Sequence, residues 1–271
     1  MNLVNGAAVD SISARDRGLA YGDGVFRTFP LRGKRPVLWQ RQYAKLAHDC
    51  LALRIACPAV EAFERDLALI AATQSDCIVK IMVTRGEGAR GYAPPAQAPC
   101  TRIVTASPLP QYPQDRAEQG VRIHFCRIRL ACQPALAGIK HLNRLENVLA
   151  RAEWSDPGIA EGIMCDADDN IICGTMSNVF IFRDGTLLTP DLARCGVAGV
   201  MRDLVIELAG AHAVPLRVTA IGIDELLAAE EVFVVNSVIG LWPVVALDRK
   251  VWKSGPQSRR FRQWIDDVQS R

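Results

Sequence analysis

The sequence predicts a mixed α/β protein built from two domains. Strand and helix patterns alternate both in the first hundred residues and after a proline-rich segment near the middle of the chain. That segment, Pro108 to Pro113 (PLPQYP), holds three prolines, which cannot sit inside a helix or a central strand. We therefore predict a small N-terminal domain over residues 1–108, a linker over 109–117 and a larger C-terminal domain over 118–271.

The N-terminal domain combines short apolar strands with two amphipathic helices. In the first helix, apolar residues such as Tyr43, Leu46 and Cys50 recur at helical spacing. A turn-rich stretch, Tyr21 to Gly24, introduces one of the strands. The expected strands cover residues 2–5, 25–31, 36–39, 77–84 and 102–106, and the expected helices cover 40–53 and 59–72.

The C-terminal domain begins with a strand and a loop that leads to an amphipathic helix. Turns rich in aspartate, asparagine and glycine separate its later strands. The expected strands cover residues 121–127, 162–166, 171–172, 178–183, 214–218, 231–236 and 241–247. The expected helices cover 142–154, 199–210 and 257–268.

Composition gives little reason to expect a macromolecular partner. The 271 residues include 32 basic and 29 acidic side chains, for a net charge of +3, so neither nucleic acid nor a membrane surface is an expected partner. The N-terminus lacks the basic start and apolar centre of a signal peptide. The apolar runs are far shorter than the roughly 20 residues that cross a bilayer.

The nine cysteines favour a reduced, cytoplasmic protein. Their number is odd and no two form a CxxC pair, so neither a metal site nor a disulfide framework is expected. Cys126 and Cys165 lie in apolar stretches, where a free cysteine behaves as a small core residue. Reduced thiols of this kind are typical of the cytoplasm.

Lys140 is the first candidate for chemistry. It ends a mostly uncharged stretch (ACQPALAGIK) just before a predicted helix. Apolar surroundings disfavour the charged form of a lysine, and Schiff-base chemistry requires the neutral amine. On local evidence alone, a lysine before a helix is more often a surface residue.

Two other segments could bind an anion. Gly196 to Arg202 (GVAGVMR) opens a helix behind a glycine-rich turn, where backbone N–H groups can approach a phosphate. It matches neither a Walker loop nor the dinucleotide fingerprint, so a simple tight turn is the local alternative. Asn236-Ser237 ends an apolar strand, where small polar residues either line a pocket or cap a turn.

Arg90 and Tyr92 lie in a glycine-rich loop (RGEGARGYAPP) and are candidates for substrate contacts. Arginine is the preferred bidentate partner of a carboxylate. The alternative for this stretch is a solvated surface loop.

Four segments, which follow one another in the order of the family's motifs, together resemble the class IV aminotransferase family, the fold-type IV pyridoxal phosphate enzymes. They cover nearly the whole chain and are Asp16 to Phe26 (DRGLAYGDGVF), Gly138 to Arg151 (GIKHLNRLENVLAR), Gly174 to Phe180 (GTMSNVF) and Gly196 to Arg202 (GVAGVMR). Within the second segment, KHLNRLE is most similar to the aminodeoxychorismate lyase branch of the family.

The resemblance implies a fold, a cofactor and an assembly. The fold would be a small N-terminal α/β sandwich domain and a larger C-terminal pseudo-barrel domain, with pyridoxal 5′-phosphate in the cleft between them and two chains forming a homodimer. Lys140 would hold the cofactor as a Schiff base, and Thr28 would lie near the reacting carbon. Arg90 and Tyr92 would contact the substrate.

The resemblance also implies which residues bind the phosphate of the cofactor. The backbone N–H groups of Val200 and Met201 and the side chains of Asn236 or Ser237 would do so. At Lys45 the family usually has an arginine, so the charge stays but the bidentate fork is lost.

Cys173 is the most informative departure from the family, which usually has a glutamate there, paired with the pyridine nitrogen of the cofactor. Without that carboxylate the ring is a weaker electron sink. Transamination needs a strongly stabilised carbanion, whereas an elimination expels its leaving group as charge develops. Cys173 therefore favours a lyase over a transaminase.

The resemblance thus predicts a lyase that converts 4-amino-4-deoxychorismate to 4-aminobenzoate and pyruvate, a step of folate synthesis. The nearest alternative is a D-amino acid or branched-chain aminotransferase. A second alternative is an inactive homologue that keeps the fold as a binding scaffold.

Overall fold

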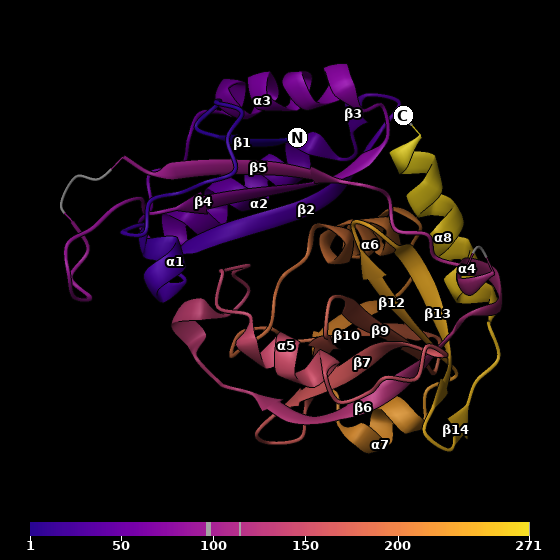
Figure 1. Cartoon of the computed structure of the whole chain (residues 1–271). Helices are drawn as coiled ribbons and strands as arrows, with labels where there is room; N and C mark the ends of the chain where they lie inside the picture. The colour runs from indigo at the N-terminus through magenta and orange to yellow at the C-terminus, as the bar shows by residue number, and fades with distance from the viewer. Residues whose placement is uncertain (96–98, 114, 271) are drawn as a thin grey trace. The chain divides into compact units, whose positions relative to one another are not determined.

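The structure, a computed structural model, describes residues 1–95, 99–113 and 115–270 (Figure 1). They fall into two compact units. The first comprises Met1–Pro110 with Ile139–Asn143, and the second comprises Gln111–Gly138 with Arg144–Arg271. The predicted linker 109–117 includes Gln114, which lies outside the described residues.

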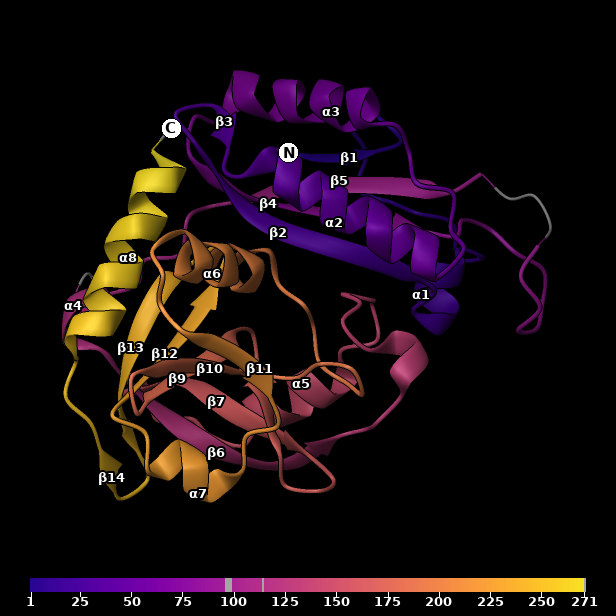
Figure 2. The same cartoon turned by 180° about the vertical axis from the view of Figure 1, so that it is seen from behind.

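The first unit contains a five-stranded antiparallel sheet covered by helices. Its strand order is β1-β5-β4-β2-β3. The helix α2 packs on β2 and α3 packs on β5, as Figure 2 shows. The strands are β1 (Asn2–Val4), β2 (Gly24–Arg32), β3 (Arg35–Pro36), β4 (Cys77–Thr84) and β5 (Thr101–Ser107), and the helices are α1 (Arg17–Tyr21), α2 (Trp39–Ala52) and α3 (Val60–Thr73).

Aromatic side chains fill the core between this sheet and its helices. Phe29 projects from β2 toward α2, where its ring centre lies 5.8 Å from that of Trp39. Phe63 on α3 meets the same indole ring edge-on at 6.3 Å. Residues of β2 that alternate with Phe29 point to the opposite face of the sheet, because successive side chains of a strand alternate.

The second unit is built on a nine-stranded mixed sheet, in the order β11-β10-β9-β12-β13-β6-β7-β8, with β14 paired to β13. The sheet curls, so that β8 at one end returns to contact β9 and β10. The strands are β6 (Val121–Leu130), β7 (Ile159–Asp166), β8 (Ile171–Gly174), β9 (Asn178–Arg183), β10 (Thr186–Pro190), β11 (Leu216–Thr219), β12 (Glu231–Asn236), β13 (Gly240–Leu247) and β14 (Lys250–Val251).

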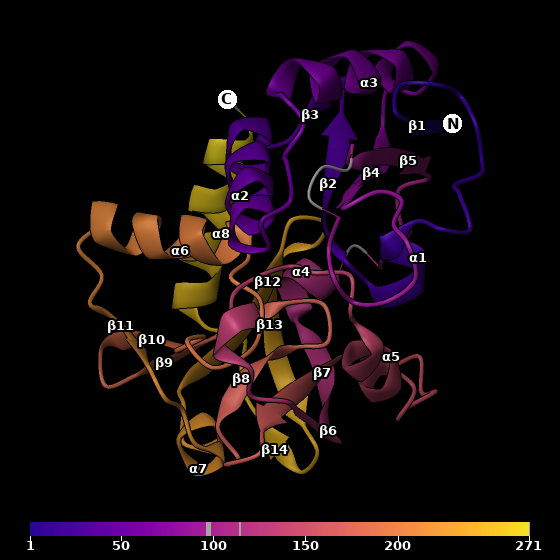
Figure 3. The same ribbon diagram turned by 90° about the vertical axis from the view of Figure 1, so that its left-hand side faces the viewer.

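Helices pack along this curled sheet. The helix α5 lies against β6 and β7 (Figure 3), and α6 and α8 pack on β12 and on each other. The helices are α4 (Arg116–Gln119), the 3-10 turn η1 (Pro134–Leu136), α5 (Leu145–Arg151), α6 (Val200–Ala211), α7 (Ile223–Leu227) and α8 (Pro256–Gln269).

The expected helix over 142–154 is shorter than the sequence pattern predicts. It begins at Leu145, because the residues before it extend along β2 instead: the N–H of Leu142 donates to the carbonyl of Gly24 at 2.9 Å. The expected strand over 36–39 is also wrong beyond Pro36, since Trp39 already begins α2. The helix α1 was not expected from the apolar pattern; it follows Asp16, whose side chain caps its first turn.

Replacing Phe233 by alanine tests the packing of α8 on the curled sheet. Phe233 is fully buried and stacks on Phe180 at 5.2 Å and on Phe261 of α8 at 5.8 Å. Phe233→Ala should lower the free energy of unfolding in urea by about 3–5 kcal/mol, through lost burial and the cavity left behind. Val218→Ala, at a half-exposed position of β11, is the control and should change it by less than about 0.5 kcal/mol. Equal shifts for both variants would contradict this packing.

Candidate active site

Lys140 lies beside the outer edge of β2, held by backbone hydrogen bonds. Its carbonyl accepts from the N–H of Phe26 at 3.0 Å, and Leu142 continues the pairing to Gly24. The Lys140 Nζ lies 4.5 Å from the centre of the Phe26 ring. The amine is therefore held over an aromatic face. A lysine that was only a surface residue before a helix would instead project freely from its loop.

The sheet face that carries the Phe26 ring also carries Thr28. Both residues point to the same side of β2, because they are two positions apart. In the register of the sheet, Thr28 lies directly opposite Lys80 of β4, so the side chains of Thr28 and Lys80 are cross-strand neighbours. The first unit thus brings the amines of Lys140 and Lys80 to the Phe26 ring, with Thr28 beside Lys80 on the same sheet face.

Lys80 is a residue that the sequence analysis missed. Its Nζ lies 4.9 Å from the Phe26 ring centre, on the face shared with Thr28. Burial lowers its pKa from the ordinary lysine value. The available signal was a lone lysine in the middle of an otherwise apolar strand (CIVKIMVT), which alternation places among buried neighbours.

The glycine-rich turn before α6 presents backbone N–H groups. Gly196 has a φ of +87°, which favours glycine, and its carbonyl accepts from the N–H of Gly138 at 3.0 Å. Gly199 caps α6 without any side-chain hydrogen bond. The first backbone N–H groups of a helix have no carbonyl acceptor within the helix. At Val200 and Met201 these donors and the helix dipole form a set that suits a phosphate ester.

Asn178 fixes the shape of this turn from the neighbouring strand β9. Its Oδ1 accepts from the N–H of Gly199 at 3.2 Å, and its Nδ2 donates to the carbonyl of Val197 at 2.8 Å. A Cβ at residue 199 would lie 2.4 Å from that Oδ1, so glycine is required there. The asparagine of the GTMSNVF segment therefore holds the backbone of the glycine-rich turn in place.

Glu161, also missed from the sequence, organises the loop that follows Cys173. The carboxylate is 1% exposed and accepts from the backbone amides of Gly162, Thr175 and Met176 at 2.8, 3.0 and 3.2 Å. It also accepts from the hydroxyls of Thr175 and Ser177. Cys173 itself is buried on β8, opposite Met164 of β7. A buried carboxylate with this many donors fixes the chain that leads away from Cys173.

Asn236 and Ser237 lie at the turn between β12 and β13. The Asn236 Nδ2 donates to the carbonyl of Met176 at 3.1 Å, and its Oδ1 accepts from the amides of Val238 and Ile239 at 2.8 and 2.9 Å. Both ends of this amide are therefore used by the protein. The phosphate contact expected of Asn236 or Ser237 stays a prediction.

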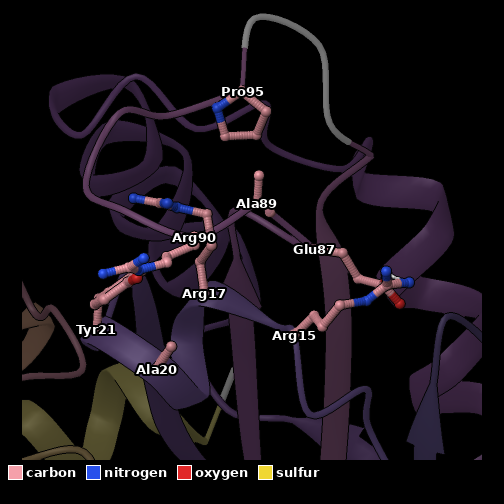
Figure 4. Close-up of a pocket in the computed structure, with 9 residues that line it drawn as sticks. Arg15, Arg17, Ala20, Tyr21, Glu87, Ala89, Arg90 and Pro95 are labelled. Atoms are coloured by element: carbon pink, nitrogen blue, oxygen red, sulfur yellow. Dashed lines mark hydrogen bonds and ion pairs between the residues drawn. The ribbon is translucent and has the colours of Figure 1, made fainter.

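Arg90 and Tyr92 lie on a loop that borders a pocket of about 640 Å³ in the first unit. Figure 4 shows Arg17, Tyr21 and Arg90 gathered on one side of it, with the Arg15–Glu87 ion pair on the other. Tyr92 is 85% exposed, with its ring 5.4 Å from that of Tyr21. Three arginines line the pocket, of which Arg15 pairs with Glu87 and Arg17 with Asp23. A guanidinium such as that of Arg90 suits a carboxylate ligand.

Arg17 secures this loop from beneath. Its guanidinium donates to the carbonyls of Gly91 and Tyr92, each at 3.0 Å, and pairs with Asp23 at 2.9 Å. Burial would raise the pKa of Asp23, but hydrogen bonds from Arg85 and Arg17 outweigh it and hold that pKa below its usual value. The loop with Arg90 is thus held by a partly buried ionic network of Arg17, Asp23 and Arg85.

Lys45, the predicted phosphate contact, lies half-buried on α2. Its backbone carbonyl is 3.4 Å from the Arg27 guanidinium, and its side-chain role stays a prediction. Over the described ranges 1–95, 99–113 and 115–270, no cluster of His, Cys, Asp or Glu could hold a metal ion. In the same part of the chain, no helix is long and apolar enough to cross a membrane.

The family model described as amino-transferase class IV matches residues 24–247. The chain belongs to this family, as the four sequence segments predicted. The sequence is 34% identical to an aminodeoxychorismate lyase of Vibrio harveyi, over 90% of each chain.

Solved structures agree with this assignment. A 4-amino-4-deoxychorismate lyase of Pseudomonas aeruginosa superposes with a TM-score of 0.95, at 49% identity and over 98% of each chain. A branched-chain amino acid aminotransferase of Escherichia coli superposes with a TM-score of 0.86, over 99% of this chain and 94% of that one, but at 22% identity its likeness concerns the fold alone. The predicted fold class, fold-type IV, is confirmed.

Replacing Lys80 by methionine tests the burial of its amine. Because burial lowers the native pKa of Lys80 from 10.5, the unfolded chain binds more protons between the two pKa values, and native stability rises with pH there. Lys80→Met should therefore be more stable than the wild-type protein near about pH 7. This difference in stability should shrink as the pH approaches the pKa of Lys80 in the unfolded chain. Urea denaturation at a series of pH values measures it. An advantage independent of pH would contradict the account.

Proposed function

We propose that this protein is a pyridoxal 5′-phosphate-dependent lyase that converts 4-amino-4-deoxychorismate to 4-aminobenzoate and pyruvate. The observation that carries the proposal is the fixed position of Lys140 over Phe26, on the sheet face that also presents Thr28 and Lys80. The 49% identity with a 4-amino-4-deoxychorismate lyase over 98% of the chain supports this substrate. The product 4-aminobenzoate would enter folate synthesis.

Residues of this chain suit the aldehyde and the phosphate of the cofactor. Lys140 would attach to it covalently. The amides of Val200 and Met201, together with Asn236 or Ser237, would bind its phosphate, with Lys45 as a further cation. When bound, pyridoxal phosphate supplies a conjugated ring that withdraws electrons from the substrate carbon next to the amine.

Lys140 and Thr28 would move the protons. The Lys140 Nζ would take the proton from the substrate ring carbon that bears the amine. Departure of the enolpyruvyl group needs a proton at its ether oxygen or at the pyruvate carbon. Protonated Lys140, or Thr28 through a water, would donate it. Aromatisation of the substrate ring makes the elimination favourable.

Cations around the site would position the substrate. Both products are carboxylates, so the substrate offers negative charge to Lys80 on the sheet and to Arg90 on its loop. Arginine can bind such a group with two parallel hydrogen bonds, whereas lysine acts as a point charge. Tyr92 would add a hydroxyl contact.

Cys173 supports elimination over amino transfer. A thiol gives the pyridine nitrogen no fixed negative charge, so the bound ring would withdraw electrons less strongly. Elimination tolerates this, because the departing pyruvate unit takes up charge as it leaves. Transamination lacks such an outlet and would suffer more.

We also propose that the protein is a cytoplasmic homodimer. The nine free cysteines suit a reducing compartment. The helix α5 exposes an apolar stripe: Leu145, Val148 and Leu149 are 68%, 60% and 52% exposed, at positions that share one helix face. Burial of such a stripe against a second copy of the chain would stabilise a dimer.

The reaction of the purified protein with aminodeoxychorismate tests the assignment. Wild-type protein with pyridoxal phosphate should release 4-aminobenzoate and pyruvate in equal amounts, with no keto acid added. Lys140→Ala should abolish pyruvate release and the absorbance of the covalently bound cofactor, since both depend on its Nζ in this proposal.

Three results would contradict the proposal. Pyruvate release that persists in Lys140→Ala would exclude the role of that amine. Amino transfer that requires a keto acid would indicate an aminotransferase. A protein that stays colourless with added pyridoxal phosphate would indicate a scaffold without cofactor chemistry.

A charge on α5 tests the proposed dimer. Val148→Asp should convert the protein to monomers in analytical ultracentrifugation, because burying an unpaired carboxylate in an apolar interface is costly. Val251→Asp, at a position 72% exposed on β14, is the matched control and should stay dimeric. A wild-type protein that sediments as a monomer would contradict the dimer itself.

A further inference from the structure

One buried carboxylate in the first unit contacts the backbone of Lys140. The Oδ2 of Asp49, on α2, accepts from the Lys140 N–H at 3.0 Å. The same oxygen forms an ion pair with the guanidinium of Arg27. Asp49 is 1% exposed and Arg27 is 2% exposed, so neither is a surface charge.

Strand alternation explains how Arg27 reaches this position. Phe26 and Thr28 point to the open face of the sheet, so Arg27 between them points under α2. There it meets Asp49, and a second contact lies 3.4 Å away at the carbonyl of Lys45, one helical turn earlier. A buried charge without a partner is strongly destabilising, so each member of the pair requires the other.

The pair secures the one backbone group of Lys140 that β2 does not hold. Phe26 donates to the Lys140 carbonyl, while Asp49 accepts from the Lys140 N–H. Both peptide groups that flank the Lys140 Cα are therefore tied to β2 and α2. A residue fixed on both sides has little freedom to rotate, so its side chain leaves the backbone in one direction.

A second buried pair in the same unit lacks this connection. Asp66 on α3 is 2% exposed and pairs with Arg102 at 2.6 Å. Within the described part of the chain, the Asp66 side chain accepts hydrogen bonds from Arg102 and not from the segment 139–143. Burial and pairing alone thus do not distinguish Asp49 from Asp66. The bond to Lys140 does.

We propose that Asp49 is a positioning residue for Lys140 and that Arg27 is the counter-charge that allows this carboxylate to be buried. The inference rests on the proposed function, because it assumes that the Lys140 amine carries the cofactor. Asp49 touches neither cofactor nor substrate in this account. It acts by fixing the backbone from which the amine extends, and a misplacement of about 1 Å in a catalytic group can cost on the order of 100-fold in rate.

Two double variants separate the hydrogen-bond acceptor from the ion pair. Arg27→Met with Asp49→Asn removes both charges but keeps an oxygen that can accept from the Lys140 N–H. Arg27→Met with Asp49→Leu removes both charges and the acceptor. Replacing a buried ion pair by apolar groups is often tolerated, so both proteins are expected to fold.

The measurements are the melting temperature, kcat and KM, and the rate at which borohydride fixes pyridoxal phosphate to the Lys140 peptide, read by mass spectrometry. The asparagine variant should stay within about threefold of wild type in kcat and trapping rate. The leucine variant should lose about 30-fold or more in kcat and tenfold in trapping rate, with KM changed less than about threefold. Equal kcat and trapping in the two variants would overturn the positioning role.

Single alanine variants give a second comparison that does not depend on the leucine protein. Asp49→Ala and Asp66→Ala each remove one buried carboxylate, so both should lower the melting temperature. Trapping at Lys140 should slow about tenfold or more in Asp49→Ala and less than about twofold in Asp66→Ala. Equal slowing in both would overturn the inference while leaving the proposed function intact. A wild-type protein in which Lys140 is never trapped would overturn both.

Discussion

The pairing of residues 140–142 with the open edge of β2 is the constraint on which the rest of the first unit depends. Two backbone hydrogen bonds, at Phe26 and Gly24, turn what would be a loop into an added strand segment. The Lys140 amine then has a defined position over an aromatic ring. The same pairing explains why α5 starts at Leu145, three residues later than helical periodicity suggests.

In the second unit, side chains of neighbouring segments fix the shape of the glycine-rich turn before α6. Asn178 and Gly199 shape that turn, and the amides at the start of α6 supply the donors. Glu161 fixes the neighbouring loop with backbone and hydroxyl donors alone. The polar side chains here bind the backbone and fix its shape. In the proposed function, the backbone amides contact the ligand.

Much of this could be predicted from the sequence, for reasons that differ between residues. Apolar periodicity locates β4, α3 and α8 because each buries a regular face. Lys140 and the turn at Gly196 are visible because glycines and an isolated charge interrupt apolar stretches. Ordered motifs then identify the family, which local patterns alone could not do.

What the sequence does not reveal is mostly long-range. In the sequence, Asp49 is one polar position of an amphipathic helix. The residues around it do not predict that its carboxylate contacts residue 140, far along the chain. Glu161 likewise precedes its hydroxyl partners by more than ten residues. Lys80 becomes informative only when the register of β2 and β4 places it opposite Thr28. Such contacts depend on tertiary packing, which the periodicity of apolar residues does not predict.

The central claim is that the Lys140 amine bonds covalently to pyridoxal phosphate. A crystal structure of the protein grown with the cofactor tests it most directly. The account predicts continuous electron density from the Lys140 Nζ to the aldehyde carbon of the cofactor, with the phosphate at the amides of Val200 and Met201. A cofactor bound elsewhere, or a Lys140 side chain directed into bulk solvent, would contradict it.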